Sequence, residues 1–243
     1  MDNKYLHFFT ALHGSQNYGV EYNQSDVDTR TIIIPFDSFD TNWVNSMMFV
    51  PPESEHADIK DIRIMFDLFS QQMSAYLEIL FTPYVNVNPL FQEQYNVLHE
   101  NRETIAHLNP YLGMKMTVQH IMDEYNLFDN PHSHILKADV ITKYGYDPKL
   151  LHHMVRLQEL LQRYIIDGDS FEDCLKTKQP ERLIEIKQGC IPSKQAFILR
   201  EDIKNWAIDF ENAQKHILSK TYNSQGQNIL NTTLTECFAI TKQ

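Results

Sequence analysis

The sequence predicts an α+β protein in which a small mixed sheet with helices is followed by a mostly α-helical part. Three observations indicate this fold class. Apolar and β-branched runs typical of strands concentrate before Pro83, helical periodicity dominates after it, and the 243 residues include only seven glycines. We expect two domains, with residues 1–90 forming the catalytic domain and residues 91–243 forming a helical C-terminal domain.

The strands are expected in three segments of the first domain. Residues 5–12 (YLHFFTAL) form a compact apolar run, and the turn-like GSQNYG follows it. Residues 25–35 (SDVDTRTIIIP) alternate acidic and apolar side chains, continue as a β-branched run and end at a proline. Residues 57–64 (ADIKDIRI) alternate again and predict a third strand. Residues 36–55 are expected to be an irregular loop.

Helices are predicted for most of the remaining chain. Residues 66–81 have helical spacing, and the same periodicity recurs in residues 88–108, 111–128, 148–168 and 194–220. The third of these later helices is expected to end at Asp167-Gly168-Asp169.

The composition is that of an ordinary globular protein. Hydrophobic residues make up 42% and charged residues 22% of the chain. Its three scattered cysteines fit neither a disulfide framework nor a zinc site. No stretch approaches the ~20 apolar residues of a membrane span, and the N-terminal run lacks the basic lead of a signal peptide. We therefore expect a cytoplasmic protein with no membrane partner.

The formal net charge of −11 argues against extensive non-specific contact with nucleic acid, which requires many lysines and arginines at phosphates. The stretch from Cys174 to Lys204 is an exception, because its basic residues outnumber its acidic ones. This stretch predicts a mixed-charge helical surface, and the alternative is a face for a phosphate-bearing partner.

Two aspartates are the centre of the predicted site. Asp26 and Asp28 lie two residues apart, so on a strand both side chains point to one face. Neighbouring carboxylates repel each other unless a cation lies between them. Hard oxygen ligands suit Mg²⁺ or Mn²⁺. The pair therefore predicts a divalent metal site, although such a pair in isolation often forms only a polar turn.

Gly14 and Ser15 follow the first predicted strand. A glycine at this position lets the backbone approach a ligand closely, and Ser15 adds a hydroxyl donor. If this segment opens a helical turn, its free N–H groups form an anion site. Tyr18 is expected to shape the loop or to stack on a base. Metal ligands beside phosphate donors are what a nucleoside triphosphate with its magnesium ion requires.

A third carboxylate would complete a two-metal site. The candidates are Asp58 and Asp61. Asp58 is favoured because it lies centrally in the third predicted strand, whereas Asp61 is alternatively the cap of the helix that follows. Arg30 shares strand parity with Asp28 and is expected to pair with a carboxylate or to touch phosphate.

These motifs, in the order GS, YG, SDVDTR and IIIP, resemble the DNA polymerase β-like nucleotidyltransferases. The most similar branch is the RlaP type, named for an RNA repair pathway, and the likeness covers roughly residues 8 to 200. Further residues that carry it are Glu78, Leu80-Phe81, Lys149, His153, Arg156 and Leu157. The chain departs from the branch at His56, at Ile64, and at Gln72-Met73-Ser74, which replaces a Gly-Asn-Pro.

The resemblance implies transfer of a nucleoside monophosphate from an NTP to an acceptor hydroxyl, with release of pyrophosphate. It implies that Asp26, Asp28 and Asp58 are catalytic and bind Mg²⁺ or Mn²⁺, and that Gly14 and Ser15 bind the nucleotide phosphates. The acceptor is an RNA end, a protein hydroxyl or a small molecule.

Lys149, His153 and Arg156 share one face of a predicted helix. The resemblance implies that they also bind the nucleotide, and the alternative is a solvated face opposite an apolar one. The runner-up function is a degenerate nucleotide-binding, regulatory or antitoxin-like module without catalysis. A metal-dependent phosphodiesterase would need a set of histidines near the aspartates, and His13 alone is nearby.

Overall fold

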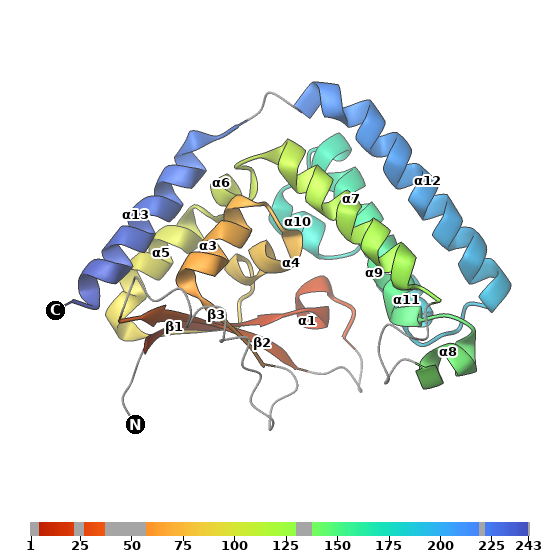
Figure 1. Ribbon diagram of the computed structural model, residues 1–243, viewed down its shortest axis with the longest axis horizontal. Coiled ribbons are helices and arrows are strands. Elements are labelled where there is room, and N and C mark those ends of the chain that lie inside the picture. The colour runs from red at the N-terminus through yellow and green to blue at the C-terminus, as the bar shows by residue number, and fades with distance from the viewer. Residues whose placement is uncertain (1–4, 22–26, 37–56, 130–137, 219–221, 243) are drawn as a thin grey trace. The chain divides into compact units, whose positions relative to one another are not determined.

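The chain has the predicted α+β architecture, with a four-stranded mixed sheet and helices followed by a largely helical region (Figure 1). The computed structural model describes residues 5–21, 27–36, 57–129, 138–218 and 222–242. Contacts between Cα atoms divide them into two compact units. The first unit contains the described residues of 1–17, 24–109 and 222–243, and the second contains those of 18–23 and 110–221. The predicted domains, 1–90 and 91–243, stay a prediction.

The sheet consists of β1 (Tyr5–His13), β2 (Asp28–Pro35), β3 (Ala57–Asp61) and β4 (Val85–Val87). Its order is β3-β2-β1-β4. The pairs β1/β2 and β1/β4 are antiparallel, and β2/β3 is parallel. The three predicted strands are confirmed for the described residues, although β3 ends at Asp61, earlier than expected. The short strand β4 was not predicted, because three residues are too few to show an alternation.

The first strand is anchored by two neighbouring phenylalanines. The register with β2 shifts between His7 and Phe9, so Phe8 is the extra residue of a β-bulge. Phe8 and Phe9 are both fully buried. Their rings lie 5.7 Å from that of Phe91 and 5.1 Å from that of Tyr95, respectively. The aromatic run therefore joins the sheet to the helical segments that follow β4.

The helices of the first unit lie along one side of the sheet in Figure 1. They are α3 (Ile62–Ser70), α4 (Ser74–Leu77), η1 (Glu78–Leu80), η2 (Pro89–Phe91), α5 (Gln92–Glu100), α6 (Arg102–Ala106) and α13 (Ser224–Ile240). The single helix predicted for residues 66–81 is wrong, because Gln72 adopts a φ of 58° and interrupts it. A left-handed residue cannot continue a right-handed helix.

The second unit is helical, as predicted. Its helices are α7 (Pro110–Leu127), α8 (Ala138–Tyr144), α9 (Pro148–Leu161), the π-helical η4 (Gln162–Asp167), α10 (Phe171–Leu175), α11 (Pro180–Lys187) and α12 (Ser193–Leu218). The helix α9 packs against α7, α11 and α12. Gly168 follows η4 with a φ of 74°, which confirms the predicted helix end.

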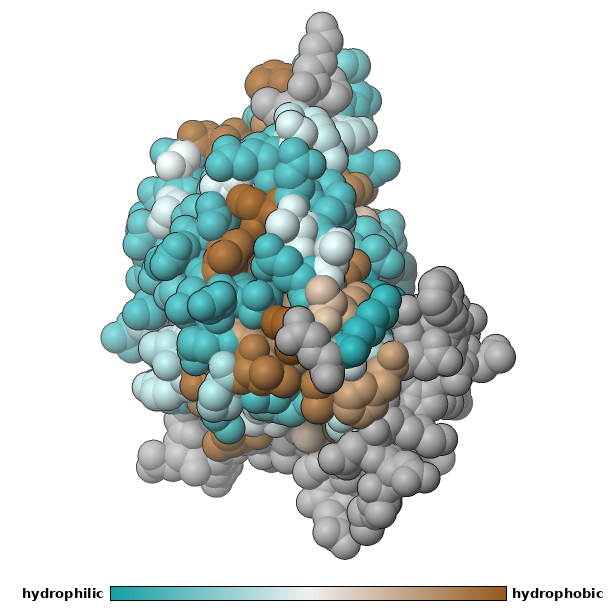
Figure 2. Space-filling view, turned by 90° about the vertical axis from the view of Figure 1, so that its left-hand side faces the viewer, coloured by the Kyte–Doolittle hydropathy of each residue, from teal (hydrophilic) through white to brown (hydrophobic). Residues whose placement is uncertain are grey.

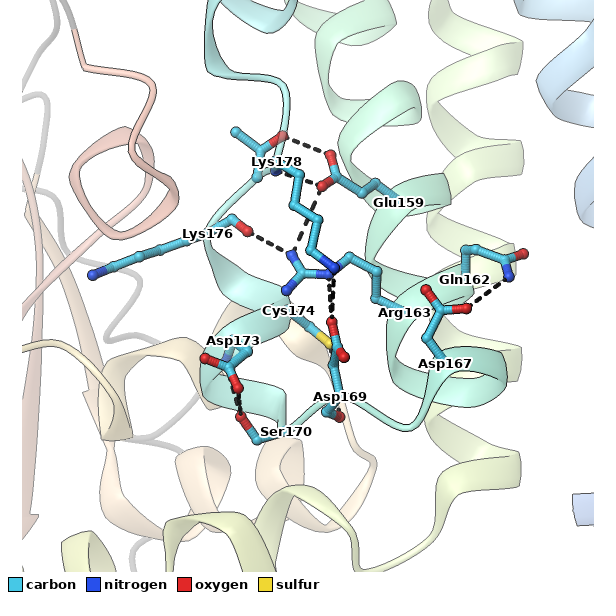
Figure 3. A network of polar contacts seen from close by, with 11 residues as sticks. Glu159, Gln162, Arg163, Asp167, Asp169, Ser170, Asp173, Cys174, Lys176 and Lys178 are labelled. Atoms are coloured by element: carbon cyan, nitrogen blue, oxygen red, sulfur yellow. Dashed lines mark hydrogen bonds and ion pairs between the residues drawn. The ribbon is translucent and has the colours of Figure 1, made fainter.

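A polar network secures the end of α9 (Figure 3). The buried Arg163 donates from Nε to Asp169 Oδ2 at 2.8 Å and from Nη1 to the Lys176 carbonyl at 2.7 Å. Glu159 lies 3.7 Å from the same guanidinium and accepts the backbone N–H of Lys178 at 2.6 Å. The guanidinium therefore ties η4 and α9 to the segment between α10 and α11.

The surface of the first unit mixes residue types. On the face that carries α5 and α13, Figure 2 shows apolar residues set among hydrophilic ones, which is ordinary for a globular surface. Among the helices that the structure describes, none is both long enough and apolar enough to cross a membrane.

Candidate functional site

Gly14 lies where β1 ends and the short α1 (Ser15–Tyr18) begins. Its φ of 89° is one that residues with a Cβ rarely adopt. A helical turn does follow Gly14, and Ser15 is its first residue. The backbone N–H of Gly14 donates to Glu78 Oε2 at 3.2 Å.

Asp28 lies directly beside this turn. It is the first residue of β2 and pairs with His13, the last residue of β1. A Cβ placed on Gly14 would lie 3.4 Å from Asp28 Oδ2. Gly14 and the half-buried Asp28 are thus brought together as predicted. Asp26 lies outside the described residues.

Glu78 supports the turn from a buried position, a role that was not predicted for it. It is 1% exposed, and its Oε2 also accepts from Asn17 Nδ2 at 3.3 Å. The same Asn17 nitrogen donates to the Leu12 carbonyl at 3.1 Å. Glu78 therefore holds the turn at Gly14 and at Asn17, and Asn17 in turn links it to the Leu12 carbonyl. The available signal was a single carboxylate within the apolar run LEILF.

Asp58 shares a sheet face with Asp28, as expected for the third carboxylate. Arg30 lies two residues beyond Asp28 on β2 and is the register partner of Asp58 on β3. However, one Asp58 oxygen accepts from Arg30 Nε and the other from Lys60 Nζ, both at 2.7 Å. Burial raises the pKa of Asp58, but hydrogen bonds and charges of these two cations outweigh it and lower the pKa overall.

Arg30 is fixed in this position by further contacts. Its Nη1 donates to the Ala75 carbonyl at 2.7 Å, and its guanidinium lies 4.2 Å from the centroid of the Tyr76 ring. The predicted pairing of Arg30 with a carboxylate is confirmed. Asp61, the alternative to Asp58, caps α3 by accepting the Arg63 backbone N–H at 2.8 Å.

A magnesium ion fits this donor set in part. Asp28 places a half-buried carboxylate beside the Gly14 turn. Both Asp58 oxygens accept hydrogen bonds from cations. Among the described residues, no group of three or more His, Cys, Asp or Glu side chains is arranged to hold a metal ion. The role of Asp58 as a metal ligand therefore requires Arg30 and Lys60 to release it, and this role stays a prediction.

The three predicted nucleotide-binding residues of α9 belong to the second unit. Lys149 is exposed in the first turn of the helix, after the cap residue Asp147. His153 Nδ1 lies 3.0 Å from Glu124 Oε1. Arg156 is buried, with its guanidinium 3.7 Å from the centroid of the Tyr18 ring. The helix face that these three residues share is therefore exposed at Lys149 and buried at Arg156.

Arg200 and Lys204 of the basic stretch between Cys174 and Lys204 are paired with carboxylates, as expected for a mixed-charge helical surface. Arg200 lies 3.2 Å from Asp129 and 3.0 Å from Glu201, which also pairs with Lys204. Such pairing leaves these cations with less free charge to offer a phosphate-bearing partner.

No protein-family model, no curated protein and no solved structure matches this chain.

Proposed function

We propose that the protein is a magnesium-dependent nucleotidyltransferase of the DNA polymerase β-like type. The observation that supports it best is the close approach of Gly14 to the Asp28 carboxylate. Glycine leaves room there for phosphate oxygens next to a metal-binding carboxylate, and the antiparallel pairing of His13 with Asp28 holds the two together.

The residues have separate roles in this proposal. Asp26 and Asp28 would hold Mg²⁺ or Mn²⁺, which would neutralise charge on the triphosphate. Gly14 and Ser15 position the phosphates, so that the acceptor hydroxyl attacks in line and pyrophosphate leaves. Glu78 keeps the Gly14 turn in place from its buried position. The charge of −11 makes a short or small acceptor more suitable than a long nucleic acid.

The second candidate is a nucleotide-binding module that has lost catalysis. The observation that favours it is the pairing of Asp58 with both Arg30 and Lys60, because a carboxylate with two cationic partners is a poor metal ligand. In that case the turn at Gly14 binds a nucleotide without transferring it.

Label transfer tests the proposal. The protein is incubated with labelled NTPs, magnesium and a cell extract, and labelled product and pyrophosphate are measured. We expect transfer by the wild type and a loss on the order of 10²–10³-fold in Asp28→Asn, as for removal of a charge-stabilising group. Asp209→Asn, an exposed carboxylate on α12, is the matched control and should retain activity.

Two outcomes decide between the candidates. Binding of NTP without transfer, equal in the wild type and in Asp28→Asn, would support the non-catalytic module. Absence of both binding and transfer in the wild type would overturn both.

A further inference from the structure

One of the buried arginines lacks the carboxylate partners that the other two have among the described residues. The described residues include three buried arginines, Arg30, Arg156 and Arg163, each 6% exposed. Arg30 pairs with Asp58, and Arg163 pairs with Asp169. By contrast, Arg156 makes neither a hydrogen bond nor an ion pair with any described residue, and its buried Nε has no acceptor.

An unmatched buried cation is costly, because burial removes water without replacing its hydrogen bonds. The Tyr18 ring offsets part of this cost by stacking on the guanidinium, but a ring accepts no conventional hydrogen bond. A guanidinium presents its donors in a planar fork that suits phosphate oxygens. Arg156 therefore has the character of an anion-binding group.

His153 lies three residues earlier on the same helix, and Glu124 of α7 determines its tautomer. The ionised carboxylate of Glu124 only accepts hydrogen bonds, so His153 Nδ1, 3.0 Å from Oε1, carries the hydrogen. In the neutral ring, Nε2 then carries a lone pair. The same Glu124 oxygen lies 3.2 Å from His120 Nε2, whereas Oε2 is buried without a partner.

The ionisable groups around His153 come from two helices. On α7 they are His120 and Glu124, and on α9 they are Lys149, His152 and Arg156. Burial lowers the pKa of His153, Glu124 raises it, and Arg156 and Lys149 lower it further, so that the pKa lies below its ordinary value. Burial raises the pKa of Glu124, but hydrogen bonds from His120 and His153 bring it to about 2. At neutral pH the cluster thus holds a carboxylate and a neutral His153.

We propose that Arg156 and His153 form a phosphate-binding site in the second unit, in which ligand binding is coupled to uptake of a proton at His153. The inference rests on the proposed function for its ligand class, the phosphate groups of a nucleotide. Arg156 supplies the positive charge and the donors. Glu124 is a positioning residue, which keeps the Nε2 lone pair of His153 available for the proton shared with a phosphate oxygen.

The coupling follows from the proton balance. A phosphate monoester loses its second proton near pH 6. Above that pH, a phosphate oxygen and the Nε2 lone pair are two acceptors, so a proton from solvent must join the complex. Below it, the ligand brings the proton itself. Binding should take up about one proton at about pH 8 and none below about pH 6.

Nuclear magnetic resonance of isotope-labelled histidine tests the site without requiring activity or metal. The probe is inorganic phosphate, and the signal of His153, one of eleven histidines, is identified by its absence in His153→Asn. We expect a protonated Nδ1 and an unprotonated Nε2 in the free protein. Saturating phosphate should raise the proton affinity of His153 at least about 100-fold, because an imidazole whose pKa starts below 6.5 holds a proton at about pH 8 only after such an increase. Arg156→Met, which retains the packing volume, should abolish this response.

Arg182→Met is the matched control, because Arg182 is an exposed arginine on α11 of the same unit and should not affect the response. If Arg156→Met does not fold, Arg156→Lys is tested in its place. Lysine retains the positive charge but lacks the planar fork of N–H donors, so the response to phosphate should weaken. An Nε2–H tautomer in the free protein, a response that survives loss of Arg156, or no response at millimolar phosphate would each overturn the inference. Phosphate binding without label transfer would overturn the proposed function alone, and transfer without phosphate binding would overturn this site alone.

Discussion

At the scale of single residues, the proposed chemistry depends mainly on buried charged side chains. Glu78 holds the turn of Gly14 beside Asp28, and Arg30 neutralises Asp58. Arg156 has no such partner among the described residues. Residue type is the same in the paired and unpaired arginines, so the difference in chemistry comes from what the fold places beside them.

Gln72 offers a test at this scale, because it combines backbone strain with buried hydrogen bonds. Its Nε2 donates to the carbonyls of Phe69 and Ile105, both at 2.8 Å, and its Oε1 accepts the Asn109 N–H at 3.2 Å. We expect Gln72→Ala to lower the free energy of unfolding by about 2–4 kcal/mol, since these backbone groups lose their partner. Gln72→Gly should cost about 1 kcal/mol less, because glycine tolerates a φ of 58°.

Urea unfolding measures both variants, and Gln71→Ala at the exposed neighbouring position is the control. A glycine variant less stable than the alanine variant would show that the left-handed backbone is not a source of strain.

At the scale of elements, α9 is the helix on which the second unit depends. Asp147 caps it by accepting the Lys149 N–H at 2.9 Å, and the predicted apolar side is buried. The polar residues of this helix are partly buried as well, because α7, α11 and α12 all pack against it. His152 Nδ1 lies 3.0 Å from the Leu183 carbonyl, and that hydrogen bond links α9 to α11.

The buried His152 predicts that the stability of the second unit depends on pH. Burial is the main cause that lowers its pKa from 6.5 to about 3, so the folded unit keeps the ring neutral while the unfolded chain protonates it. The unfolded state binds more protons between these values, so stability falls as the pH decreases from 6.5 towards 3. The loss from this group is about 3–5 kcal/mol.

Thermal unfolding across that pH range measures the effect. His152→Asn retains a donor for the Leu183 carbonyl and should flatten the dependence, whereas His216→Asn, at an exposed position on α12, should not. An unchanged slope in His152→Asn would contradict the assignment.

At the scale of the whole molecule, the predicted site residues divide between the two units. Gly14, Ser15, Asp28 and Asp58 belong to the first, and the three residues of α9 belong to the second. The net charge of −11 opposes broad contact with a polyanion, and in the basic stretch Lys178, Arg200 and Lys204 are paired with carboxylates.

This charge balance predicts weak and only slightly salt-dependent binding to long nucleic acid. The affinity for random-sequence duplex, measured against salt concentration, should have a logarithmic slope shallower than about −3, equivalent to few phosphate contacts. Lys176→Gln, at an exposed position of the basic stretch, should not change it. A slope near −6 or steeper would reveal a nucleic-acid surface.

Local sequence patterns were sufficient to predict much of the fold. The runs that became β1, β2 and β3, the helical periodicity after Pro83 and the helix end at Gly168 were all predicted, because each depends on neighbouring residues. The short strand β4 and the interruption at Gln72 were not, because each is stabilised by contacts with distant segments, β1 in one case and Ile105 in the other.

The sequence by itself determined the α+β class, the turn at Gly14 and the position of Asp28 on a strand, since these follow from residue type and spacing. The tertiary structure alone decided that Glu78 supports that turn, that Arg30 and Lys60 pair with Asp58, and that no carboxylate of the described segments pairs with the buried Arg156. The physical reason is that hydrogen bonding and charge pairing depend on distances of about 3 Å between residues far apart in the chain, which no local pattern encodes.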